Sequence, residues 1–240
     1  MKILFSLFSI SILISCYAWG TPAQVVLIRH AEKLATGGEV NRQGCERAYL
    51  LPNFFLNNPI VEQFGAPVAT YAVAPNHAYS AVRAIQTIAP TAQALRLQVL
   101  DPATRLQYSL IVQQIMSNPN YDGKTVLIAW EHKAIPGLAE AFGATLSSDM
   151  KKWPGKVFDE AWILDFAGAP TPSVQIIAED VLPNDNPDGG TNWKNPPASL
   201  NSDSGIPQQI VNECADNSAL NKLVAQITNP PPAIYFSTRP

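Results

Sequence analysis

The stretch Val25–Lys33, VVLIRHAEK, places an uninterrupted apolar run directly before an arginine and a histidine. The run lacks the polar alternation of a half-exposed strand, so it predicts a central strand that is buried on both faces. Ligands of open α/β sheets bind at the carboxyl ends of the strands. We therefore expect Arg29 and His30 to lie at a ligand-binding edge.

Segments of strand and helix character alternate along the rest of the chain. Short β-branched runs predict further strands at residues 68–74, 97–100, 125–130, 161–166 and 174–178. Amphipathic patterns with stop signals predict helices at residues 43–56, 80–95, 104–116, 135–142 and 217–228. This alternation predicts an α/β fold with a mainly parallel central sheet that is covered by helices on both faces.

Length and charge limit the possible functions. A chain of 240 residues, 47% of them hydrophobic, is typical of one domain with a substantial core. The formal net charge of -3 provides no bulk attraction for nucleic acid, which we do not expect as a partner. Any bound anion must therefore be held by particular arginines or lysines.

Residues 1–20 have the pattern of a bacterial secretory signal. Lys2 precedes an apolar stretch that is too short to span a bilayer, and small residues follow before Thr21. Cleavage there would leave residues 21–240 as the exported domain, periplasmic or secreted. Alternatively, Leu13–Cys16 resembles a lipobox, and a lipid on Cys16 would attach the protein to a membrane.

The C-terminal part of the chain differs in amino-acid composition from the rest. Residues 182–240 are rich in proline and loop-forming residues, which favours a wrap over the core rather than a second domain. Export would place Cys45 and Cys214 in an oxidising compartment, where they could form a disulfide. The alternative is a buried Cys45 on a helix and a Cys214 in a loop, and the sequence does not decide between the two.

Polar residues follow three of the predicted strands. Arg29 and His30 end the first strand, His77 and Arg83 follow the second, and His132 follows the fourth. Each alone is more often a solvated or structural side chain, but together they bring cations and imidazoles to one edge. Guanidinium groups match phosphoryl oxygens, and an imidazole can act as a nucleophile and form a phospho-enzyme.

Four blocks of the chain resemble the histidine phosphatase superfamily, the phosphoglycerate mutase-like proteins. They occur in the expected order and span roughly half of the chain, which makes them jointly specific. The blocks are RHAEK at Arg29–Lys33, NRQGCERA at Asn41–Ala48, SAVRAIQT at Ser80–Thr87, and VLIAWEH at Val126–His132. The RHAEK form resembles exported members of the family, and the resemblance implies a three-layer sandwich with helices on both faces of the sheet.

The resemblance also implies roles for single residues. His30 would be the nucleophile that takes the phosphoryl group, Arg29 and Arg83 would bind its oxygens, and His132 would complete the phosphate site. The family's chemistry needs no metal and no organic cofactor, so we expect neither. His77 could line the site or be an ordinary loop histidine.

The general acid departs from the family pattern. Mutase-like members carry a glutamate soon after the second arginine, but no glutamate lies between Arg83 and Glu131 here. The candidates are Asp101, after the third strand, and Glu131, beside the second histidine. Alternatively, Asp101 caps the helix after Pro102, and Glu131 pairs with Lys133 or Arg83.

The sequence thus predicts an exported phosphatase that hydrolyses small-molecule or peptide phosphomonoesters through a phosphohistidine at His30. One alternative is a catalytically weak protein that binds or senses a phosphorylated ligand, because the acid is absent or misplaced. Another is a mutase-type phosphotransferase, which export disfavours.

Overall fold

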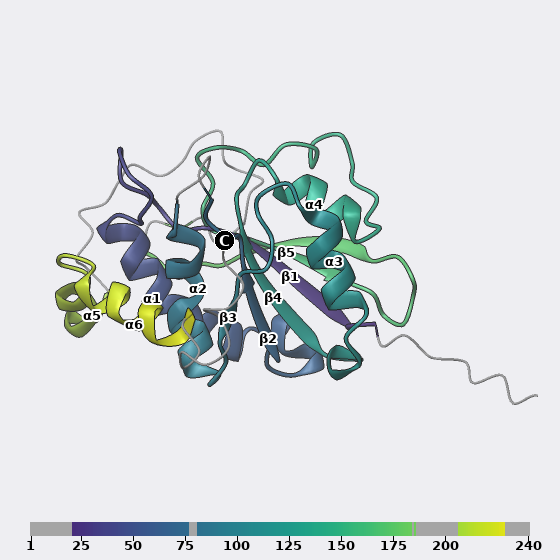
Figure 1. The fold of residues 1–240 in the computed structure, drawn as a ribbon, viewed down its shortest axis with the longest axis horizontal. Helices are drawn as coiled ribbons and strands as arrows, with labels where there is room; N and C mark the ends of the chain where they lie inside the picture. Colours follow the sequence, from purple (N-terminus) through teal and green to yellow (C-terminus); the bar gives the residue numbers. More distant parts are fainter. Residues whose placement is uncertain (1–20, 77–80, 184, 186–205, 229–240) are drawn as a thin grey trace, which may run out of the picture.

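The structure is a computed structural model, which describes residues 21–76, 81–183, 185 and 206–228 (Figure 1). The expected signal segment with Cys16, the loop histidine His77, Ser80 of the third block and much of the Pro-rich C-terminal stretch lie outside these residues. Within the described ranges, no helix combines the length and the apolar character needed to cross a membrane.

The centre of the fold is a six-stranded sheet with the order β3-β2-β4-β1-β5-β6. Its strands are β1 (Gln24–Arg29), β2 (Ala69–Ala72), β3 (Val99–Leu100), β4 (Thr125–Trp130), β5 (Glu160–Asp165) and β6 (Ser173–Ala178). Neighbouring strands from β3 to β1 pair parallel, whereas β5 pairs antiparallel with both β1 and β6.

The sheet is therefore mixed, and the expectation of a mainly parallel sheet was wrong. After the last parallel strand and its helix, residues 143–159 form no further helix that would carry the chain back across the sheet. The chain enters β5 beside the end of β1, where Ile28 pairs with Ala161, and so runs in the opposite direction.

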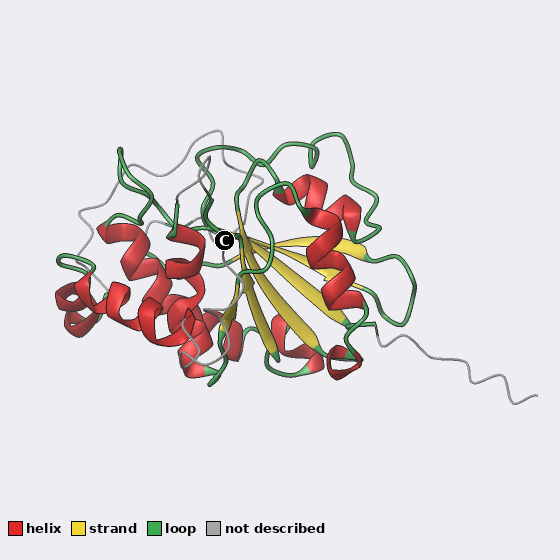
Figure 2. Ribbon diagram, viewed as in Figure 1, coloured by secondary structure: helices red, strands yellow, loops and turns green. Residues whose placement is uncertain are grey.

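Helices cover both faces of the sheet, which gives three layers. In Figure 2 the strands lie between two groups of helices. The first group contains α1 (Arg42–Asn57), α2 (Arg83–Ala94), α5 (Gln208–Glu213) and α6 (Ser218–Thr228), and the second contains α3 (Tyr108–Met116) and α4 (Ile135–Ala141). Two 3₁₀ turns, Val61–Phe64 and Pro119–Tyr121, complete the elements.

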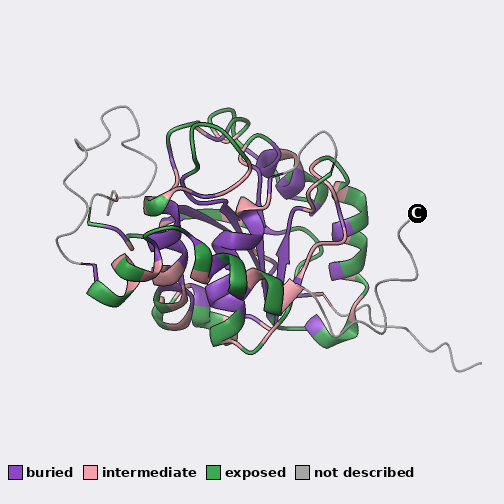
Figure 3. Ribbon diagram, turned by 60° about the vertical axis from the view of Figure 1, so that its left-hand side comes forward, coloured by how far each residue is buried: buried purple, intermediate pink, exposed green. Residues whose placement is uncertain are grey.

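The core explains why the first strand decides the fold. Every residue of β1 and β4 is buried, and the interior of the fold is coloured purple in Figure 3. Because both faces of the two strands are covered, the side chains of Val25–Ile28 and Val126–Trp130 are apolar without alternation. Polar residues stand at the ends of these runs, with Gln24 and Thr125 at one edge of the sheet and Arg29 at the other.

The start of α1 is fixed against the loop after β1. Asn41 caps the helix by accepting a hydrogen bond from the backbone N–H of Gly44, and its own N–H donates to the carbonyl of Glu32. A Cβ atom on Gly44 would lie 2.1 Å from that same carbonyl oxygen. The glycine of the second block is thus required by the close approach of helix and loop.

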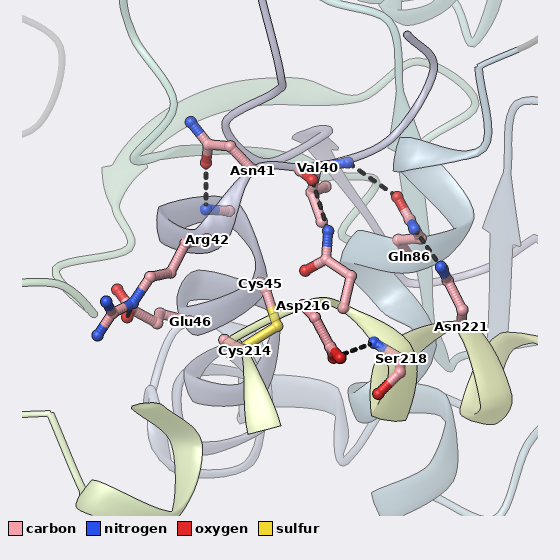
Figure 4. Close-up of a disulfide and its surroundings, with 12 residues drawn as sticks. Val40, Asn41, Arg42, Cys45, Glu46, Gln86, Cys214, Asp216, Ser218 and Asn221 are labelled. Carbon is pink, nitrogen blue, oxygen red and sulfur yellow. Dashed lines mark hydrogen bonds and ion pairs between the residues drawn. A yellow bond between two sulfur atoms is a disulfide. The ribbon is translucent and has the colours of Figure 1, made fainter. Parts of the chain in front are cut away.

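The C-terminal helices are held to α1 and α2 by a disulfide and buried polar contacts. Cys45 and Cys214 are bonded, which settles the alternative that the sequence left open (Figure 4). Beside them, Gln86 of α2 accepts from the backbone N–H of Val40 and donates to Asn221 of α6. Residues 206–228 therefore pack on the first two helices rather than form a core of their own.

Two helix predictions differ from the structure for local reasons. The third helix begins at Tyr108 rather than at Thr104, because Gln107 Oε1 accepts from both the backbone N–H and the hydroxyl of Thr104 and closes a separate turn. Asp101 therefore does not cap this helix. The short helix α5 was missed because none of its residues is buried, so it leaves no amphipathic pattern.

Candidate active site

The ends of β1 and β4 bring the two site histidines together. Arg29 pairs with Trp130 in the parallel register, and the backbone N–H of His30 donates to the carbonyl of Trp130 over 3.1 Å. The next residues along β4 are Glu131 and His132. The rings of His30 and His132 lie 6.3 Å apart, centre to centre, at an interplanar angle of 84°.

His30 is buried and has a defined tautomer. Its Nδ1 lies 2.8 Å from the carbonyl oxygen of Ala31, and its Nε2 lies 3.2 Å from Nε of Arg83. A carbonyl can only accept and a guanidinium can only donate, so the proton is on Nδ1 and the lone pair is on Nε2. The geometry presents Nε2 as a nucleophile next to a cation.

The environment of His30 also keeps the ring neutral. Burial, together with the charges of Arg29, Arg83 and His132, lowers the pKa of His30 from 6.5 to about 3 against the opposing effect of the Ala31 hydrogen bond. Across the physiological range the ring is therefore an unprotonated base at Nε2.

The loop that carries His30 is tied to the start of α2. The backbone N–H of Ala31 donates to the hydroxyl of Thr87 over 2.8 Å, and that hydroxyl donates to the carbonyl of Arg83 over 2.6 Å. The backbone N–H groups of Val82 and Arg83 both donate to the carbonyl of Gly38. These contacts explain how residues more than fifty positions apart form one site.

Arg29 is held by the segment that leads into β5. Its Nη1 donates to the carbonyl oxygens of Gly155 at 3.0 Å and Val157 at 2.6 Å, and the guanidinium carbon lies 3.6 Å from the centre of the Phe158 ring. The same ring lies 6.2 Å from the ring of His30. Arg29 is thus a buried, oriented cation rather than a solvated one, and its role in phosphate binding stays a prediction.

Glu131 contacts both His132 and Arg105. One carboxylate oxygen lies 3.1 Å from Nδ1 of His132, and the other lies 3.6 Å from Nη1 of Arg105. Neither Lys133 nor Arg83 provides the ion pair that the sequence suggested. Burial alone raises the pKa of Glu131, but the contact and charge of His132, with help from Arg105, outweigh burial and lower it.

Glu32 of the RHAEK block has a structural partner. Nη2 of Arg47 lies 2.7 Å from a carboxylate oxygen of Glu32 and 2.6 Å from one of Asp185. Nη1 of the same side chain lies 3.2 Å from a carboxylate oxygen of Glu179. All of these groups are nearly inaccessible to solvent. Arg47 thus joins the loop after β1, the end of β6 and the segment that follows it.

The other candidate acid, Asp101, is partly buried and follows β3. In the sheet, β2 and β4 lie between β3 and β1, so the strand ends are three spacings, about 14 Å, apart. The loop from Asp101 nevertheless reaches β4, because the carbonyl of Arg105 accepts a hydrogen bond from the indole of Trp130. His77, the possible lining residue, lies outside the described residues.

A further buried acid lies at this edge. The β1 and β5 register that pairs Ile28 with Ala161 makes Arg29 and Glu160 the next neighbours across the two strands. Burial and the charge of Asp159 raise the pKa of Glu160 to about 7, against a smaller opposing effect of the Trp162 side chain. A carboxyl with this pKa can hold a proton near neutrality, as a general acid must.

Sequence reasoning missed several of these residues. Phe158, Glu160 and Arg105 lie outside the four family-like blocks, and their contacts depend on the path of β5 and of the 101–107 loop. Thr87 lies inside the third block. Its hydrogen bond to the carbonyl of Arg83 could have been predicted, because Thr87 follows Arg83 by one helical turn. Among the described residues, no three histidines, cysteines or acids gather as a metal-binding set.

Comparisons with known proteins add a limited finding. No protein-family model matches the chain, and a search of curated proteins finds no match. Among solved structures, the chain is similar to the "putative phosphohistidine phosphatase SixA from Agrobacterium tumefaciens", with 18% identity and a TM-score of 0.42 over 65% of this chain and 96% of that one. A match at this level does not assign the chain to a family, so function is inferred below from the side chains alone.

Proposed function

We propose that the protein is an exported phosphatase that hydrolyses small-molecule or peptide phosphomonoesters through a phosphohistidine at His30. The observation that carries this proposal is the tautomer of His30, whose Nε2 lone pair faces the guanidinium of Arg83 over 3.2 Å. In-line attack on phosphorus requires a neutral imidazole whose unprotonated nitrogen lies beside a cation that can bind the phosphoryl oxygens.

The proposed reaction has two displacements. In the first, the lone pair of His30 Nε2 forms a bond to phosphorus while the ester P–O bond breaks, and the leaving oxygen takes a proton from a general acid. In the second, a water oxygen attacks phosphorus, the P–N bond breaks, and its electron pair returns to Nε2. The water proton passes to the conjugate base of the acid, so the products are an alcohol and inorganic phosphate.

Three groups around His30 support binding of the transferring phosphoryl group. Arg83 already contacts the reacting nitrogen, the rings of His132 and His30 meet edge to face, and Arg29 is a buried cation whose charge acts on His30. Fixed cations in a water-poor site stabilise the charge that spreads over the phosphoryl oxygens during transfer.

For the general acid we propose Asp101 over Glu131. Glu131 is paired with His132 and Arg105, and its lowered pKa makes it a poor proton donor at neutral pH. Asp101 would meet a substrate that lies across the ends of β2 and β4. Glu160 is a second possibility, because its pKa of about 7 suits a donor.

The test is phosphate release by the purified protein from a panel of phosphomonoesters, beside His30→Gln, Asp101→Asn, Glu131→Gln and Glu160→Gln. We expect His30→Gln to abolish release and Asp101→Asn to slow esters with poor leaving groups more than aryl esters. A folded wild type that binds phosphate but releases none would replace this proposal with the phospho-ligand binder.

A further inference from the structure

We propose that Glu131 is a positioning residue, whose carboxylate holds the Nδ1–H of His132 so that Nε2 is the nitrogen left for the substrate. This inference rests on the proposed function in so far as His132 contacts the phosphoryl group. The orientation and tautomer of the His132 ring are properties of the folded protein, and the tautomer can be measured without turnover.

The contact between the two side chains is close and shielded. Glu131 Oε1 lies 3.1 Å from His132 Nδ1, and the two side chains are only 7% and 15% exposed. Nδ1 is inaccessible to water, and no group among the described residues makes a hydrogen bond of regular geometry with it. The contact with the Glu131 carboxylate is therefore an electrostatic attraction to the N–H group rather than a linear hydrogen bond. A buried ring nitrogen with one anionic neighbour carries its proton there.

The backbone explains how adjacent residues come to face each other. Side chains alternate along a regular strand, which argues against a contact between neighbours. However, β4 ends at Trp130, and the carbonyl of Glu131 accepts from the N–H groups of Ala134 and Ile135 as the chain turns into α4. Glu131 and His132 therefore lie in a turn, where alternation no longer applies.

The contact with His132 chiefly keeps the carboxylate of Glu131 in its charged form, and Arg105 adds a smaller effect. Nη1 of Arg105 lies 3.6 Å from the second oxygen of Glu131, and the carbonyl of Arg105 is held by the indole N–H of Trp130 at 3.1 Å. The cation is thus delivered by a loop that is fixed to the strand carrying Glu131. An ionised carboxylate accepts hydrogen bonds but has no proton to donate. This suits a positioning residue and not a general acid.

The two histidines are therefore oriented by different kinds of partner. His30 has a neutral carbonyl at Nδ1, whereas His132 has a carboxylate there. A carbonyl at Nδ1 leaves the first ring an uncharged nucleophile, while a carboxylate at Nδ1 fixes which nitrogen of the second ring faces the substrate. The two rings thus have unlike partners at Nδ1, which divides attack and stabilisation between them.

The experiment measures the tautomer of His132 by long-range proton–nitrogen NMR on protein labelled at histidine. The chain has three histidines, so His132→Gln assigns the signal. We expect Nδ1 to be protonated in the wild type, and Glu131→Gln to shift the proton populations and lower kcat about tenfold to a hundredfold with little change in KM. Glu131→Asp keeps the charge and should recover part of both.

Glu140→Gln is the matched control, because it makes the same substitution on α4 at a surface carboxylate that pairs with Lys151. It should change neither readout. An unprotonated Nδ1 in the wild type, or Glu131→Gln with an unaltered tautomer, would overturn the inference. If His30→Gln retains activity while the tautomer is as expected, the proposed function fails and the positioning role stands.

Discussion

Arg83 donates its Nε–H to Nε2 of His30, while Nδ1 of the same ring lies against the carbonyl of the next residue. The ring is therefore fixed between a partner that only accepts and one that only donates. The accepting carbonyl lies in the loop after β1 and the donating guanidinium lies on α2, so the reactive form of His30 depends on the packing of helix against loop.

The buried neutral His30 predicts a pH dependence of stability. Its pKa falls from 6.5 in the unfolded chain to about 3 in the fold, so between these values the unfolded state binds more protons. The contribution is complete above about pH 6.5 and is lost as the pH falls toward about 3, with a slope of at most about 1.4 kcal/mol per pH unit. Urea unfolding at several acidic pH values should show a shallower slope for His30→Gln, and equal slopes would contradict the burial of a neutral ring.

Arg83→Lys should impair catalysis although it preserves the charge. Lysine has no Nε–H at the position that contacts His30 and no planar fork for the phosphoryl oxygens. We expect kcat/KM to fall about a hundredfold and inorganic phosphate to inhibit more weakly. Arg96→Lys, at an exposed position in the turn just after α2, is the control. Equal losses in the two variants would indicate a general effect on the helix.

Gly44→Ala should damage the site from a distance. The added Cβ would lie 2.1 Å from the carbonyl of Glu32, and the clash is with backbone that cannot rotate away. We expect a loss of about 1–3 kcal/mol in the free energy of unfolding and lower activity, because the displaced loop carries His30. Gly155→Ala meets no atom within 4 Å and should be nearly neutral in thermal unfolding.

Removing the disulfide should destabilise the protein strongly. Cys45 and Cys214 are 169 positions apart, for which loop closure in the unfolded chain predicts about 5 kcal/mol. The double variant Cys45→Ala, Cys214→Ala should unfold at lower denaturant, and a reductant should lower the wild-type midpoint but not that of the variant. An unchanged wild-type midpoint under full reduction would show that the buried contacts of α6 suffice.

The sequence predicted the parts of the fold that local pattern controls. All six strands and five helices were expected, since apolar runs and periodicity reflect burial on the two faces of a sheet. The direction of β5 was not predicted, because it depends on the path of residues 143–159 at the edge of the sheet. The start of α3 was shifted by one side chain, Gln107, which competes with the backbone for Thr104.

For the candidate site, the sequence predicted which strand ends come together but not most of the contacts around them. The residues at strand ends, His30 and His132, meet as their positions in parallel neighbours require. The contacts of Arg29 and the partner of Glu131 were not predictable, because Phe158 and Arg105 come from long connections with no periodic pattern. The strand rule of alternating faces also counted against Glu131, since the sequence does not show that the chain turns there.

The measurement that tests the central claim most directly is capture of the phospho-enzyme during turnover. Protein mixed with excess aryl phosphate is quenched in alkali, which preserves phosphohistidine, and its peptides are analysed by mass spectrometry. The account predicts one phosphoryl group on the peptide that contains His30, and none in His30→Gln. Rapid hydrolysis with no phosphoryl group on His30, or with unchanged rate in His30→Gln, would contradict it.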